Sequence, residues 1–167
     1  MEISIKTIVF FLTLLTTGLS SGLFYAWQVS VIPGTRRVTD QSYLESMQQI
    51  NRAIINPWFM FIFMGALLFL AWSTWFSYQT ADRTTFILML IATLCYAGGT
   101  FGVTAAGNVP LNNWLEAINL NELSSLKMVE TRAHYEPKWN RLHLIRTIFS
   151  VLAFSATLLA LLTEYKK

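Results

Sequence analysis

The chain has 167 residues and a mass of 19.1 kDa; 54% of the residues are hydrophobic and only 13% are charged. A water-soluble domain carries about 25% charged residues, so much of this surface does not face water, which excludes disorder and most soluble folds. The net charge of +3 is not concentrated in basic runs, so no nucleic-acid partner is predicted. The lone Cys95 excludes an internal disulfide and a cysteine-rich metal site.

Four apolar stretches are long enough to cross a bilayer as helices, because about 20 residues span about 30 Å of hydrocarbon. Lipid leaves no water to satisfy open backbone groups, so all four stretches are predicted to be helical. The connection between the second and third stretches is very short, which makes them antiparallel neighbours. The predicted spans are 7–32, 58–79, 84–107 and 139–163.

The connection between the first and second spans is predicted to hold an amphipathic helix over about 40–56. Asp40 or Ser42 is placed to cap its start, and Asn56–Pro57 to end it. Gln48 is assigned to the polar face. The predicted apolar face recurs at three- and four-residue steps and consists of Tyr43, Leu44, Met47, Ile50 and Ile54.

The third span is predicted to end abruptly because Gly107 and Pro110 interrupt a helix near the membrane interface. A second amphipathic segment is predicted over 111–135. Four spans place both chain ends on one side of the membrane and both long connections on the other. The predicted fold is therefore an all-α bundle of four transmembrane helices in one domain over 1–167. This predicts a multi-pass protein of the plasma (inner) membrane that contacts membrane lipids.

Three chemistry-bearing residues share one face of the last span. Trp139, His143 and Arg146 follow at steps of four and three. An arginine within hydrocarbon costs about 2.5 to 3.5 kcal/mol, so Arg146 is expected either to extend to the interface or to face a polar interior. One hypothesis is a pocket lined by this face. The alternative is that Trp139 and Arg146 are interfacial anchors and that a carbonyl caps His143.

Amide side chains gather at the same ends of the spans. A helix break at Gly107–Pro110 would free Asn108 and Asn112 to bond to a ligand or, alternatively, to exposed carbonyls. Glu130 and His134 are four residues apart, but two histidines without a cysteine cluster supply too few ligands, so no metal site is predicted. The sequence has neither a phosphate-binding loop nor a serine-nucleophile motif.

Four segments carry a resemblance to a known family. They are 18–34 (GLSSGLFYAWQVSVIPG), 47–57 (MQQINRAIINP), 107–112 (GNVPLN) and 139–147 (WNRLHLIRT). In this order and spacing they resemble the anthrone oxygenase-like family of small four-helix membrane proteins. The resemblance implies a membrane four-helix bundle in a family that is largely uncharacterised. Its named fungal members oxidise anthrones to anthraquinones with molecular oxygen and no known cofactor.

The resemblance also suggests roles for individual residues. Removing a proton from the anthrone methylene, which is conjugated with the carbonyl through the ring system, gives an enolate that reacts with oxygen, so the chemistry needs a base and an anion clamp, and no cofactor is predicted. His143 is the candidate base because it titrates near neutral pH. The candidate catalytic residues are His143, Arg146 and Asn108. Arg52 would help to hold the oxyanion, Asn51 and Asn112 would orient it, and Trp139 and Trp27 would stack on a flat ligand.

Three interpretations stay open at this stage. The first is an oxygenase acting on a lipophilic aromatic compound of anthrone or quinol type. The second is a non-catalytic bundle that binds a lipid, quinone or haem, and the third is a structural or partner-binding membrane protein. A pocket beneath the two long connections would favour the first, whereas a solid interior would favour the third. Orientation and oligomeric state do not follow from the sequence.

Overall fold

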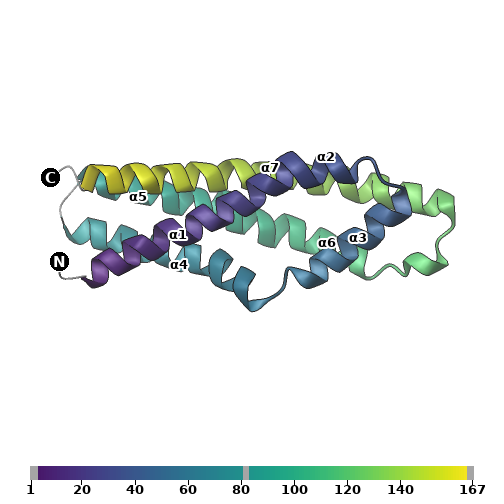
Figure 1. Cartoon of the computed structure of the whole chain (residues 1–167), viewed down its shortest axis with the longest axis horizontal. Helices are drawn as coiled ribbons and strands as arrows, with labels where there is room; N and C mark the ends of the chain where they lie inside the picture. The colour runs from purple at the N-terminus through teal and green to yellow at the C-terminus, as the bar shows by residue number, and fades with distance from the viewer. Residues whose placement is uncertain (1–3, 81–82, 165–167) are drawn as a thin grey trace.

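A computed structural model describes residues 4–80 and 83–164, and all the regular elements in these ranges are helical. They form an elongated bundle in which α7 runs the full length (Figure 1). Four helical stretches are long and apolar enough to cross a membrane, so the predicted fold class is confirmed. In chain order the elements are α1 (Ile5–Ala26), the π-helix η1 (Trp27–Val31), α2 (Ile32–Thr35), α3 (Asp40–Ala53), α4 (Pro57–Gln79), α5 (Arg83–Leu94), the π-helices η2 (Cys95–Gly102) and η3 (Thr104–Asn108), α6 (Val109–Glu116), the 3₁₀ turn η4 (Leu120–Glu122) and α7 (Ser125–Glu164).

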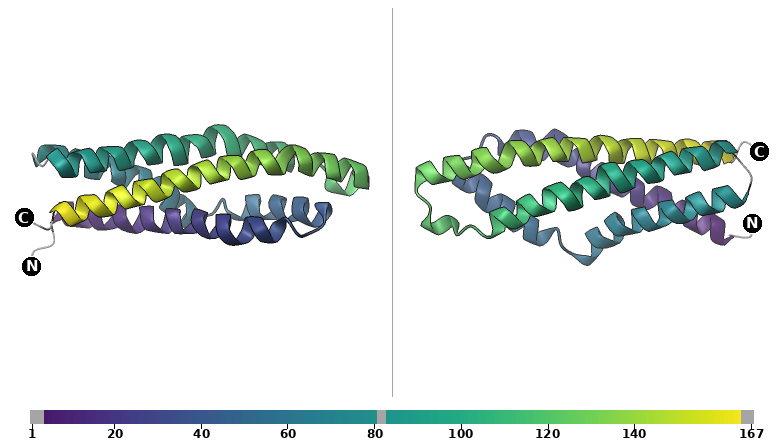
Figure 2. Two further views of the ribbon diagram at one scale, coloured as in Figure 1. Left: turned by 90° about the horizontal axis from the view of Figure 1, so that it is seen from above. Right: turned by 180° about the vertical axis from the view of Figure 1, so that it is seen from behind.

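The four long helices pack as a ring. Helix α1 contacts α4 and α7, and α5 contacts the same two helices from the other side; Figure 2 shows this arrangement from above and from behind. Hydroxyl pairs join neighbouring helices: Thr13 bonds to Ser73 at 2.7 Å between α1 and α4, and Thr74 bonds to Thr93 at 2.8 Å between α4 and α5. Such bonds satisfy polar groups where lipid offers no partner, at about 0.6 kcal/mol each.

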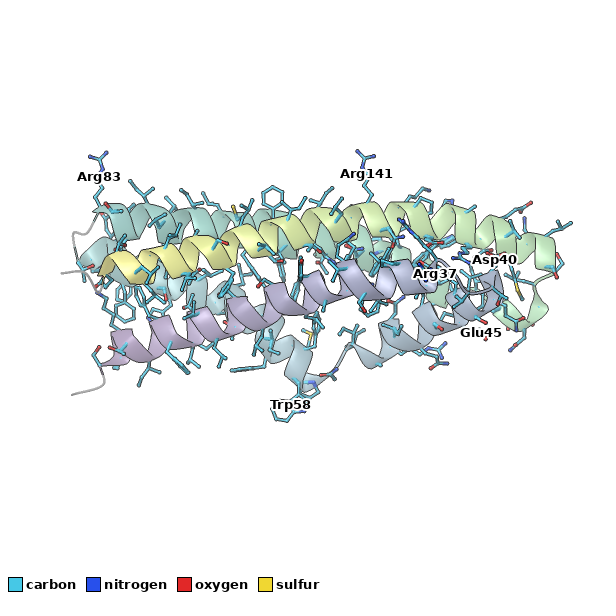
Figure 3. All side chains as sticks on the ribbon, turned by 45° about the horizontal axis from the view of Figure 1, so that its top comes forward. Arg37, Asp40, Glu45, Trp58, Arg83 and Arg141 are labelled. Carbon is cyan, nitrogen blue, oxygen red and sulfur yellow. The ribbon has the colours of Figure 1, made fainter. Side chains whose placement is uncertain are left out.

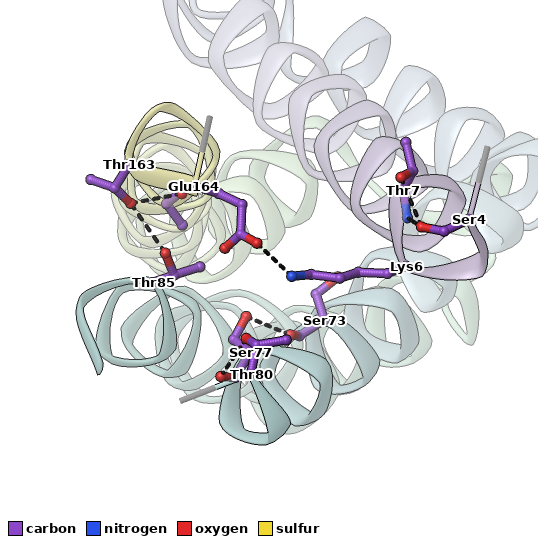
Figure 4. A network of polar contacts seen from close by, with 10 residues as sticks. Ser4, Lys6, Thr7, Ser73, Ser77, Thr80, Thr85, Thr163 and Glu164 are labelled. Atoms are coloured by element: carbon purple, nitrogen blue, oxygen red, sulfur yellow. Dashed lines mark hydrogen bonds and ion pairs between the residues drawn. The ribbon is translucent and has the colours of Figure 1, made fainter. Parts of the chain in front are cut away.

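The beginning of α1 and the end of α7 meet at one end of the bundle. Lys6 forms an ion pair with Glu164, and Thr85 of α5 bonds to Thr163 of α7 at 3.3 Å (Figure 4). The end of α4 and the beginning of α5 lie at this same end (Figure 1). The two long connections therefore lie at the opposite end, which we call the loop end.

Exposed aromatic side chains mark both boundaries of α4. Trp58, at the loop end of the helix, is 81% exposed and points away from the bundle (Figure 3). Trp75 and Tyr78, at the other end, are 53% and 67% exposed. A rise of 1.5 Å per residue separates the two levels by about 26 to 30 Å, which matches the thickness of a hydrocarbon core. Trp and Tyr favour the headgroup layer, so we expect the bilayer boundaries at these two levels.

The helix break predicted at Gly107–Pro110 is wrong, because the chain continues without interruption from α5 through η2 and η3 into α6. The backbone widens instead: the N–H of Val109 bonds to the carbonyl of Thr104, five residues back. A proline ring clashes with the carbonyl four residues back in a regular helix, and a π turn relieves that clash. The same widening, in η1, precedes Pro33.

Helix α3 lies across the loop end with the predicted apolar residues Tyr43, Leu44 and Met47 buried. The residue that caps it is Thr39, whose hydroxyl accepts from the N–H of Ser42 at 3.3 Å. The predicted caps, Asp40 and Ser42, are therefore wrong by one and three residues; both lie inside the first turn.

Gln48 belongs to the buried face of α3 and not to its polar face, which corrects the prediction. Its amide N–H groups donate to the carbonyls of Leu115 at 2.9 Å and Ile118 at 3.0 Å. These carbonyls belong to the last turn of α6 and the residues just after it, where carbonyl oxygens lack the regular hydrogen bonds of a helix interior. Gln48 therefore attaches α3 to the end of α6.

The last helix begins earlier than predicted. Helix α7 starts at Ser125, so the segment 111–135, expected to be one amphipathic element, is divided between α6, η4 and the first turns of α7. Tyr135 is fully buried in a loop-end core with residues of α3 and α6. From this core, α7 continues as a single helix to Glu164.

Candidate functional site

His143 and Arg146 lie in the interior of the bundle, where α7 meets the end of α1 and η3. Their exposed fractions are 1% and 8%, so neither faces lipid or water. The imidazole Nε2 lies 3.1 Å from the carbonyl oxygen of Phe24, on α1. The guanidinium contacts the opposite ring nitrogen, with Nε and Nη2 of Arg146 at 3.1 and 2.9 Å from Nδ1. The two residues therefore form a buried pair.

These contacts define the protonation of His143. A carbonyl oxygen only accepts hydrogen bonds, so Nε2–H donates to Phe24. A guanidinium only donates, so Nδ1 must be the unprotonated nitrogen. The imidazole is therefore neutral, and its basic nitrogen becomes available only when Arg146 moves away.

Arg146 is a buried cation without an acidic partner among the residues that the structure describes. Its guanidinium carbon lies 4.6 Å from the ring centre of Phe24 and 5.1 Å from that of Trp139. Nη1 reaches the hydroxyl of Thr104 at 3.5 Å. Ring contacts and hydroxyls offset only part of the cost of burying a charge. An anionic or strongly polar oxygen near this guanidinium would therefore be stabilised.

An aromatic wall adjoins the pair. The rings of Trp139 and His143 stack with centroids 5.1 Å apart and an interplanar angle of 6°. Trp27, from the π-helix η1, lies 5.9 Å from Trp139 and 6.4 Å from His143. The structure thus brings together Trp27, Trp139, His143 and Arg146, which were singled out from the sequence.

Two predicted amides hold the aromatic wall in place through a tyrosine. The Oδ1 atom of Asn112 accepts from the Tyr135 hydroxyl and from Nε1–H of Trp139, both at 2.9 Å. The amide of Asn51 donates to the same tyrosine oxygen at 3.2 Å. Tyr135 was not predicted as a site residue, although it lies four residues before Trp139 and eight before His143, on the same helix face.

The remaining two predicted residues differ in their placement. Asn108 is 1% exposed; its amide N–H donates to the carbonyl of Trp139 at 3.4 Å, and its Oδ1 has no hydrogen-bond partner in the described part of the chain. Arg52 is exposed and pairs with Glu116 at 2.7 Å. The structure does not bring Arg52 to the cluster, because it lies on the outer face of α3.

An open groove, with a volume of about 670 Å³, runs along the outside of the bundle between α7 and the end of the first helix. His143, Arg146 and Asn108 are not among the residues that line it. Gln28 lines it and is the chain neighbour of Trp27. We call it the α7 groove; its lining residues are Gln28, Ile32, Arg36, Arg132, Glu136, Pro137, Asn140, Arg141 and Leu144.

The sequence of this chain also matches a family model. The model, described as anthrone oxygenase, covers residues 58–156, from the beginning of α4 into α7. The chain belongs to the anthrone oxygenase family. This confirms the resemblance noted in the sequence. Comparisons with curated proteins and with solved structures found no match. The matched region contains Asn108, Asn112, Trp139, His143 and Arg146, whereas Trp27, Asn51 and Arg52 precede it.

Proposed function

We propose that this member of the anthrone oxygenase family is a membrane-embedded, cofactor-independent oxygenase that acts on a lipophilic aromatic compound of anthrone or quinol type. The observation that carries the proposal is the buried pair of His143 and Arg146, in which a guanidinium that has no carboxylate partner in the described residues covers the basic nitrogen of a neutral imidazole. Burial strengthens electrostatic interactions, so this pair is suited to stabilise an enolate.

The first step is an exchange of partners at Arg146. The carbonyl oxygen of the substrate accepts hydrogen bonds from the guanidinium N–H groups, which no longer bond to Nδ1 of His143. Nδ1 then removes a proton from the methylene carbon, and the C–H electron pair becomes the enolate π system. The negative charge on oxygen is held by Arg146, so the base and the clamp act in sequence.

Oxygen then reacts at the carbon that lost the proton. The enolate donates its electrons to O₂, a C–O bond forms, and the resulting peroxide takes the proton from His143. His143 then removes the second hydrogen of the same carbon as a proton. The C–H electron pair forms the C=O bond, the O–O bond breaks, and the leaving hydroxide takes that proton and becomes water. One oxygen atom becomes the new carbonyl and the other becomes water, so anthrone and O₂ give anthraquinone and H₂O.

Two further features support a flat, hydroxylated ligand. Trp139 and Trp27 offer aromatic surfaces beside the pair. The buried Oδ1 of Asn108, which has no partner in the described residues, can accept from a phenolic hydroxyl. Arg52 has no role in this proposal because it lies on the outer surface of α3.

The test is turnover by the full chain in lipid nanodiscs. Anthrone is supplied under air, anthraquinone is measured by chromatography with mass detection, and empty nanodiscs give the background of spontaneous oxidation. We expect one atom of label in the quinone from ¹⁸O₂. His143→Gln should reduce the rate to background, whereas His134→Gln, the same change at an exposed histidine, should leave it unchanged. A helical spectrum equal to that of wild type controls for folding. Wild-type turnover by a folded His143→Gln variant would remove His143 as the base.

A non-catalytic bundle is the second candidate, and one observation favours it. Asn51, Asn112 and both ring nitrogens of His143 already have partners within the protein. Polar groups that satisfy one another suffice for a scaffold that binds a lipid or quinone. Saturable binding of anthrone or a quinone by the wild-type chain, with turnover equal to that of empty nanodiscs, would support this candidate instead.

A further inference from the structure

The α7 groove carries charge that the protein does not neutralise. Arg132, on its wall, bonds to Glu136 at 2.6 Å and to Asp40 at 3.1 Å, so this group of three carries a net charge of −1. Arg36 and Arg141 also line the groove, are exposed, and form no ion pair in the described residues. Adding their two charges gives the surroundings of the groove a net charge of +1.

Arg132 also holds one wall of the groove in place. Besides the two carboxylates, it donates to the carbonyl of Val38 at 2.9 Å and to that of Thr35 at 3.1 Å. Its side chain is only 13% exposed. The turn between α2 and α3 is thereby attached to α7, so the groove is preformed and Arg132 has few donors left for a ligand.

The groove crosses the boundary of the bilayer. Phe63 lies five residues deeper than Trp58 on α4, and Phe63 contacts Phe24, which contacts His143. Phe63 therefore lies about 7 Å inside the headgroup level that Trp58 marks, and His143 is joined to it through Phe24. Leu144, the chain neighbour of His143, lines the groove, whereas Arg132, about 16 Å back along α7, lies outside the hydrocarbon.

Along the groove, each exposed arginine lies about one helical turn closer to the loop end than an apolar lining residue, because Arg141 precedes Leu144 by three residues and Arg36 follows Ile32 by four. Leu144 and Ile32 line the groove, and Gln28 contributes a buried Oε1 without a partner in the described part of the chain. Arg141 extends outward from α7 (Figure 3). Among membrane components, an anionic phospholipid presents this same sequence of features, with acyl chains below a phosphodiester of charge −1.

We propose that the α7 groove binds one anionic phospholipid, with its phosphodiester between Arg36 and Arg141 and an acyl chain along Leu144. This site is separate from the buried pair and does not depend on the oxygenase proposal. Two arginines near the membrane surface each strengthen binding about fivefold, so losing both should weaken it at least about tenfold.

The experiment uses the full chain, delipidated in an uncharged detergent and titrated with phosphatidylglycerol or phosphatidylcholine under native mass spectrometry. We expect one phosphatidylglycerol to bind at least tenfold more tightly than phosphatidylcholine, and Arg36→Gln/Arg141→Gln to abolish this preference. The matched control is Arg37→Gln/Arg83→Gln, which removes the same charge from exposed arginines outside the groove and should keep the preference.

A second pair of measurements separates a lipid from a free anion. Leu144→Gln should weaken phosphatidylglycerol binding several-fold, and millimolar inorganic phosphate should not displace the lipid. Equal binding of both lipids would overturn the proposal, as would an equal loss in the Arg37→Gln/Arg83→Gln control. Full displacement of the lipid by phosphate alone would also overturn it. Thermal unfolding monitored by helicity shows whether each variant is folded.

Discussion

The buried Arg146 shows how one residue can determine the state of its neighbours. Its guanidinium donates to Nδ1 of His143, which keeps the imidazole neutral and its ring parallel to Trp139. Trp139 is held in turn by Asn112. Hydrogen bonds in such a network depend on one another, so removal of a single acceptor affects several side chains.

At the residue scale, we expect Asn112→Leu to destabilise the protein by about 2 kcal/mol or more. The change leaves the Tyr135 hydroxyl and the Trp139 indole N–H without their shared acceptor, and each unsatisfied buried donor costs about 1 to 3 kcal/mol. Asn113→Leu, the same substitution at the exposed neighbour, should change the stability by less than about 0.5 kcal/mol. Unfolding in mixed micelles measures both variants, and equal stabilities would contradict the role of Asn112.

At the scale of elements, close packing of η2 against α7 depends on small residues. A Cβ atom added at Gly99 would overlap Cβ and Cγ of Phe149, which are too near the α7 backbone to swing aside. At the adjacent Gly98, such a Cβ would meet no atom of a packed neighbour within 4 Å among the described residues. Two neighbouring glycines of one π-helix therefore differ in their function, since only Gly99 allows the two helices to approach.

Gly99→Ala should accordingly destabilise the bundle by about 1 to 3 kcal/mol, which is the cost of overpacking a filled interior. Gly98→Ala should be neutral or slightly stabilising, because alanine favours helical backbone more than glycine does. The two variants are compared by unfolding in the same mixed micelles. If both lose the same stability, the effect arises from backbone flexibility and not from contact with Phe149.

At the scale of the whole molecule, the bundle has two unlike halves. The half next to the chain ends is a ring of four apolar helices joined by hydroxyl pairs. The loop-end half has its own core, formed by α3, α6 and the first turns of α7. The buried pair and the α7 groove lie where the two halves meet, near the boundary that Trp58 marks.

We expect both chain ends to face one side of the membrane and both long connections the other. In a Cys95→Ala background, Ser4→Cys and Gln79→Cys should react with an impermeant thiol reagent from the same side. Gln41→Cys and Asn121→Cys, in the long connections, should react only from the opposite side. Reaction of Ser4→Cys and Asn121→Cys from the same side would contradict the four-span arrangement.

The candidate site was only partly predictable from sequence. The steps between Trp139, His143 and Arg146 follow helical spacing, so a shared face could be read directly. The hydrogen-bond partners of this face could not be predicted from spacing. Asn51 and Asn112 both bond to Tyr135 because α3 and α6 lie beside α7 in space. Arg52 was placed in the site because of its charge, whereas the rotation of α3 turns it outward toward Glu116.

Composition and periodicity alone determined that this chain is an all-helical membrane bundle, because hydrocarbon forces every backbone group to bond within its own helix. Membership of the anthrone oxygenase family also followed from short segments in register. The tertiary structure alone decided that the chain stays helical through Pro33 and Pro110, and that Gln48 is buried. It also decided that Arg146 covers His143. Such features depend on which groups from distant segments come into contact. Lipid makes each segment helical but does not determine these contacts, which are set by side-chain packing between helices.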